Sequence, residues 1–165
     1  MSRNTPEIYH QKMSAAFHTM IALPLAFFVY LFLEKKHNDL APLIEEGNLT
    51  YLIDFGLTLI SVILTFLAYT RFRKGLQQIN RDNSLRARFK LYVHLTVKAY
   101  LSLGITFVLL VTGLFVTTSA IFIVDYVVLL FLLSLHRPTP DKYVRDLQLD
   151  GMDKKIVKEK REFID

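Results

Sequence analysis

The chain has 165 residues, of which 52% are hydrophobic and 21% charged, and its formal net charge is +5. It contains no cysteine, which excludes disulfides, thiolate nucleophiles and cysteine-ligated metal sites. The hydrophobic residues lie in long blocks, which argues against a soluble domain. The positive charge is better explained by basic loops at anionic lipid than by nucleic acid, for which the sequence has no fold signature.

The first two apolar blocks have the length and composition of transmembrane helices. Residues 14–33 form a block of 20 residues without a formal charge, and residues 50–69 form a second block whose single charge is Asp54. Thr5 and Pro6 match a helix N-terminus, so we expect the first helix to begin near Pro6. The first block continues into charged residues without a small-residue cleavage site, which is unlike a signal peptide.

The third apolar block is too long for one span. Residues 91–135 contain 45 residues and only two charges, Lys98 and Asp125. A single helix of that length would extend about 67 Å, roughly twice a hydrocarbon core of about 30 Å. We therefore predict a helical hairpin with its turn in the hydroxyl-rich residues 115–120.

Loop charges indicate the orientation of the resulting four helices. Lys and Arg number 17 on one side of the spans and 2 on the other, so the positive-inside rule places both termini in the cytoplasm. The predicted fold is all-α: an integral membrane four-helix bundle over residues 1–136 and a short cytoplasmic helical tail over residues 137–165. The predicted spans are 14–33, 50–69, 95–115 and 120–136. Short loops and the lack of cysteine favour a bacterial cytoplasmic (inner) membrane.

The cytoplasmic segments also contain helix signals. Thr139 and Pro140 repeat the pattern at Thr5 and Pro6, and Ser84 is suited to cap the lead into the third span. After a break at Gly151, residues 152–163 are predicted to form a charged surface helix.

Polar residues inside the predicted spans are the main candidates for function, because an ionisable group there costs about 2.5–3.5 kcal/mol on insertion scales. Asp54, Thr58, Ser61 and Thr65 are spaced 4, 3 and 4 residues apart and fall within an arc of about 60° on one helix. This stripe is either a packing seam hydrogen-bonded across helices or a polar track for protons, ions or a headgroup. On the first helix, Ala22 and Ala26 form a small-x-x-x-small contact face.

Asp54 and Asp125 lie at similar predicted depth on different helices. If they face each other, repulsion and desolvation would keep one protonated and create a proton-sensitive site. In the alternative, each is hydrogen-bonded separately near the outer interface.

Lys98 lies about two turns into the third span, and we interpret it as a lysine that extends back to the cytoplasmic headgroups. The alternative is an internal lysine that binds an anion or a carboxylate. His94, Lys98, Ser102 and Thr106 recur every four residues, and we expect that side of the helix to face protein.

Two further sets of residues suggest ligands. His18 and His94 lie at comparable predicted depth on different helices, which raises haem b or a metal as a minor hypothesis; no other cofactor is expected. The basic loop before the third span is expected to contact anionic headgroups. Its candidate residues are Arg71, Arg73, Lys74, Arg86, Arg88 and Lys90.

The sequence contains no nucleotide-binding, phosphate-binding or hydrolase motif, which favours a protein without enzymatic activity. We expect a non-catalytic subunit, scaffold or assembly factor of a larger membrane complex, whose partners are lipids and other membrane subunits or copies of itself. The alternative is an oligomeric transporter or channel for ions, protons or small solutes that uses the Asp/Thr/Ser stripe. A haem b-binding membrane subunit is the minor alternative.

Overall fold

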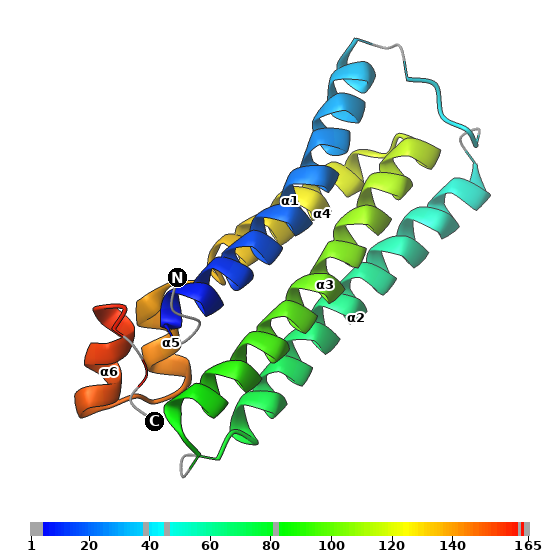
Figure 1. Ribbon diagram of the computed structural model, residues 1–165. Coiled ribbons are helices and arrows are strands. Elements are labelled where there is room, and N and C mark those ends of the chain that lie inside the picture. Colours follow the sequence, from blue (N-terminus) through cyan, green and yellow to red (C-terminus); the bar gives the residue numbers. More distant parts are fainter. Residues whose placement is uncertain (1–4, 38–39, 45–46, 81–82, 162, 164–165) are drawn as a thin grey trace. The chain divides into compact units, whose positions relative to one another are not determined.

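The structure is a computed structural model of the chain, and it describes residues 5–37, 40–44, 47–80, 83–161 and 163 (Figure 1). Every regular element in these residues is an α-helix, which confirms the predicted all-α class. The helices are α1 (Pro6–Lys36), α2 (Asn48–Gln77), α3 (Leu85–Thr117), α4 (Ala120–Ser134), α5 (Pro140–Asp146) and α6 (Gly151–Lys158).

Three of the helices, α1, α2 and α3, are long and apolar enough to cross a membrane. The fourth apolar helix, α4, has 15 residues, which corresponds to about 22 Å and is shorter than a hydrocarbon core of about 30 Å. The chain is therefore a helical protein with three candidate membrane spans and one shorter apolar helix. A fourth span stays a prediction.

The helix ends agree with the capping signals in the sequence. Helix α1 begins at Pro6, and the Thr139 side chain accepts a hydrogen bond from the backbone N–H of Lys142 at the start of α5. The Ser84 hydroxyl accepts the N–H of Ala87 in the first turn of α3. The hairpin turn is also where it was predicted, because α3 ends at Thr117 and α4 begins at Ala120.

The chain folds as two compact units, each described by itself. Unit 1 comprises Met1–His18, Tyr69–Tyr100 and Arg137–Asp165, and unit 2 comprises Thr19–Ala68 and Leu101–His136.

Unit 1 has an aromatic core centred on Phe89, which is fully buried. Its ring lies 5.8 Å from that of Tyr143, 5.7 Å from that of Phe163 and 6.2 Å from that of Tyr9, between centroids. Aromatic pairs at such separations contribute about 0.5–1.5 kcal/mol beyond their buried area. This core therefore joins residues of α1, α3, α5 and the segment after α6.

The prediction of a surface helix over residues 152–163 is wrong in part. Helix α6 ends at Lys158, and Lys160 has a φ of 55° that turns the chain away from the helix. Ile156, Val157 and Phe163 are buried in the unit 1 core. The charged residues around them suggested a solvated helix, but three apolar side chains suffice to hold the segment against Phe89.

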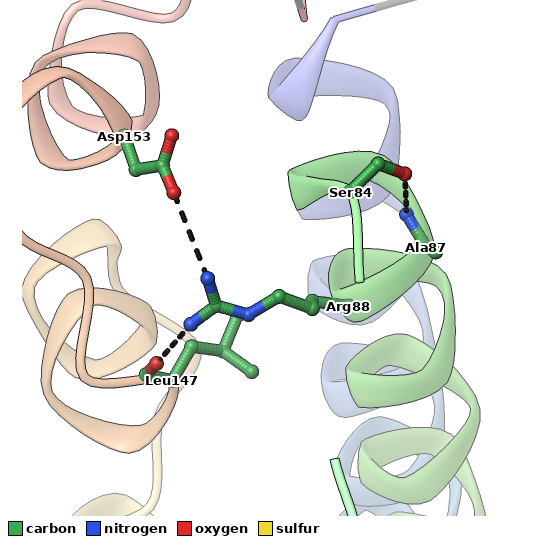
Figure 2. A network of polar contacts seen from close by, with 5 residues as sticks. All are labelled: Ser84, Ala87, Arg88, Leu147 and Asp153. Atoms are coloured by element: carbon green, nitrogen blue, oxygen red, sulfur yellow. Dashed lines mark hydrogen bonds and ion pairs between the residues drawn. The ribbon is translucent and has the colours of Figure 1, made fainter. Parts of the chain in front are cut away.

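Arg88 crosses from α3 to the chain after α5 (Figure 2). It was predicted to contact lipid, yet only 7% of its surface is exposed. Its guanidinium donates a hydrogen bond to the Leu147 carbonyl and pairs with Asp153 at 3.6 Å. Because Asp153 is partly exposed, the bond to the buried carbonyl dominates the stabilisation.

Unit 2 is held by close contacts among α1, α3 and α4. The Phe28 ring stacks on Tyr126 with centroids 3.9 Å apart, and Phe107 meets the same tyrosine edge-on at 4.9 Å. At Gly113 an added Cβ would lie 2.6 Å from the Phe122 ring, so only glycine permits this approach of α4 to α3.

We expect Arg88→Met to lower the free energy of unfolding by about 1–3 kcal/mol, because it leaves the Leu147 carbonyl without its donor. The measurement is thermal unfolding of the full chain in mild detergent, followed by circular dichroism. Arg71→Met is the matched control, since Arg71 is exposed. An equal loss of stability in both variants would contradict a structural role for Arg88.

Candidate functional site

The polar stripe of α2 lies on the inner side of unit 2. Asp54 and Ser61 are buried, while Thr58 and Thr65 are half-buried. The other side of the helix carries exposed large apolar side chains: Leu52, Phe55, Leu59, Ile60, Val62, Ile63 and Phe66. A helix with polar groups inside and apolar groups outside is suited to lipid surroundings, where polar side chains face the protein interior.

Asp54 and Asp125 each accept a hydrogen bond from a threonine of another helix. Thr117 of α3 donates its hydroxyl to Asp54 Oδ1 at 2.8 Å, and Thr58 of α2 donates to Asp125 Oδ2 at 2.8 Å. Helix α2 thus supplies the acceptor in one bond and the donor in the other, on residues one turn apart. We name these four residues the aspartate–threonine seam.

Each aspartate has a donor of its own, which corresponds to the hypothesis of separate hydrogen bonding. One oxygen of each carboxylate thus has a threonine donor. The arrangement ties α2 to the end of α3 and to α4, and it can act as a structural clamp inside the bundle.

The α3–α4 turn is a second meeting point in unit 2. Lys35 of α1 donates its ammonium to the Thr118 carbonyl, and the N–H of Leu43 donates to the Val116 carbonyl at 3.0 Å. Thr118 has a φ of 52°, a left-handed conformation that is costly for a β-branched residue. The Ser119 N–H donates to the Thr117 hydroxyl at 3.3 Å, so the turn and the seam share a residue.

Sequence reasoning did not identify Thr117 or Lys35 as site residues. Thr117 lies in the hydroxyl-rich segment whose pattern predicts only a turn, and Lys35 belongs to the few basic residues between the first two predicted spans. A buried aspartate and the carbonyls of a turn need hydrogen-bond donors, and this need was the available signal. It does not identify Thr117 or Lys35, because each donor is distant in sequence from its acceptor.

The polar residues that recur every four positions on α3 face protein over only part of the helix. They are His94, Lys98, Ser102 and Thr106. Thr106 is fully buried, with its hydroxyl donating to the Ser102 carbonyl at 3.2 Å. His94 and Lys98 are exposed, so the expectation that this whole side faces protein is wrong for them. Steps of four residues rotate by 40° each on an α-helix, and over three steps the side chains turn by about 120°.

The remaining candidates from the sequence are the two histidines, His18 and His94, and the basic loop. His18 is exposed and its Nδ1 lies 2.7 Å from the Ser14 carbonyl. Among the described residues, no group of three or more His, Asp or Glu could hold a metal ion. Haem b binding by His18 and His94 stays a hypothesis. The exposed basic residues of the loop are Arg71, Arg73, Lys74, Arg86 and Lys90.

Two pairs of titratable side chains connect helices within unit 1. Lys158 donates to Asp141 at 2.7 Å, and this hydrogen bond holds the pKa of the Asp141 carboxyl below its ordinary value. Tyr143 lies 2.7 Å from His10 Nδ1, and burial raises the pKa of the tyrosine hydroxyl. These pairs connect α5 to α6 and to α1.

Comparison with protein families, with curated proteins and with solved structures finds no match to this chain. Its function is therefore inferred from the residues and their contacts.

We expect Thr58→Val to lower the free energy of unfolding by about 1 kcal/mol, because it removes the donor to Asp125 at nearly constant volume. Thr65→Val is the matched control. Thr65 is a half-buried threonine of the same stripe, and within the described residues it forms no hydrogen bond to another helix. Unfolding in mild detergent gives both values, and a double-mutant cycle with Asp125→Asn isolates the pair. Equal effects at the two threonines would exclude a contribution from this bond.

Proposed function

We propose that the protein is a non-catalytic subunit, scaffold or assembly factor of a larger membrane complex. The carrying observation is that Asp54 and Asp125, the two carboxylates inside the predicted spans, are hydrogen-bonded to threonines within the chain. Groups that serve catalysis or conduction must exchange protons, ions or substrate, whereas these groups hold helices together. We further propose a bacterial cytoplasmic membrane with both termini in the cytoplasm, supported by the distribution of basic loop residues.

The outer surface of α1 supports association with another membrane protein. Ala22 and Ala26, which the sequence predicts to form a helix contact face, are both exposed. A small-x-x-x-small pair lets a second helix approach the backbone closely, which is how many helices associate in lipid. This face fits an apolar helix of a partner subunit.

The test is the native mass and polypeptide composition of the tagged protein, extracted from its own membranes in mild detergent. We expect other polypeptides to travel with it in fixed ratio. Replacing both alanines, Ala22→Leu with Ala26→Leu, should reduce the retained partner at least severalfold by blocking close approach. The control, Val62→Leu with Val108→Leu, adds bulk at exposed positions of α2 and α3 and should retain it. A protein that runs alone, or equal partner loss in both variants, would contradict the proposal.

A transporter or channel is the second candidate, favoured by the presence of carboxylates in apolar helices. It requires Asp54 to release Thr117 and contact a path for ions or protons. Under our proposal, liposomes with the purified protein show no pH-dependent flux above empty liposomes, and Asp54→Asn changes nothing. Flux in the wild type that Asp54→Asn abolishes would favour transport, with Thr65→Val as a variant that leaves Asp54 intact.

A further inference from the structure

Unit 1 contains an open groove between α1 and the first turns of α3. Its volume is about 700 Å³. Tyr9 and Lys12 line it from α1, and Lys90, Leu91, His94 and Val97 are among the side chains that line it from α3. The groove thus combines basic groups with an apolar wall.

The described side chains that line the groove include basic groups and no acidic residue. Lys12, Lys90 and His94 are all exposed, and no carboxylate in the described parts of the chain forms an ion pair with either lysine. Four described acidic residues of the unit have partners outside the groove: Glu7 with Lys160, Asp141 with Lys158, Asp146 with Tyr92 and Asp153 with Arg88. The groove is therefore complementary to an anion.

The apolar wall extends from the basic groups toward the predicted span. Lining residues of α3 run from Ala87 to Val97, a rise of about 15 Å. The predicted third span begins at residue 95, and Lys12 immediately precedes the predicted first span. The lysines thus lie at the expected level of phosphate headgroups, while Val97 lies at the start of the hydrocarbon.

We propose that this groove binds one anionic phospholipid. Lys12 and Lys90 bind the phosphate from two helices, and the first part of an acyl chain lies against Leu91 and Val97. This differs from general attraction of the basic loop to the membrane surface, because it depends on two lysines and an apolar wall at one place. It does not depend on the proposed subunit role.

The test uses the full chain in mild detergent and native mass spectrometry with added lipid. Phosphatidylglycerol and phosphatidylcholine with the same acyl chains are the probes. We expect one phosphatidylglycerol to bind at least tenfold more tightly than phosphatidylcholine. The variant Lys12→Gln with Lys90→Gln should lower that affinity about thirtyfold, because each of the two basic residues near the surface contributes about 1 kcal/mol. The control variant, Arg71→Gln with Lys74→Gln, removes the same charge outside the groove and should bind as the wild type does.

Two further measurements keep the proposal testable on its own terms. Val97→Phe retains both lysines but places a larger side chain in the groove, so it should weaken phosphatidylglycerol binding. This variant tests the proposal independently if the double lysine variant does not fold. A millimolar excess of inorganic phosphate should not displace the lipid. Equal binding of the two lipids, equal losses in the groove and control variants, or displacement by free phosphate would each overturn the proposal.

Discussion

Carboxylates carried into a hydrocarbon layer need hydrogen-bond donors inside the protein, since no water is present to serve them. Unit 2 contains the donors that such surroundings would require: two threonines, Thr58 and Thr117, each donate to one aspartate across helices. The orientation of α2 follows from it, because Asp54 and Thr58 must both face inward and the opposite apolar side is left outside. The length of α3 matters as well, because Thr117, which donates to Asp54, is the last residue of that helix.

The two units solve the problem of stability by different means. Unit 2 combines the aspartate–threonine seam with close ring and glycine contacts, at Tyr126 and at Gly113. Unit 1 relies on a buried aromatic cluster around Phe89 and on one buried arginine that serves a backbone carbonyl. In both units, polar side chains form hydrogen bonds that connect one helix or segment to another. Lys12 and Lys90 differ from these, because both are exposed and neither forms an ion pair with a carboxylate in the described parts of the chain.

Much of the architecture could be predicted from the sequence because apolar block length and capping residues are local signals. The start of α1 at Pro6, the turn after Thr117 and the inward stripe of α2 all follow from such signals. The long-range contacts could not be predicted, since nothing near Arg88 indicates that it would reach the Leu147 carbonyl instead of lipid. The same limit applies to Ala22 and Ala26, because their spacing identifies a face for close packing but does not say which helix would pack against it.

The position of Phe163 has a consequence for biosynthesis. Its ring packs on Tyr9 and Phe89, residues that leave the ribosome far earlier. At about 5–20 residues per second, the interval between Tyr9 and Phe163 is on the order of ten to thirty seconds. Throughout that time the growing chain exposes an aromatic surface whose covering segment has not been made. Unit 1 can therefore complete its core only after Phe163 has been synthesised, and a product truncated before Phe163 would lack part of that core.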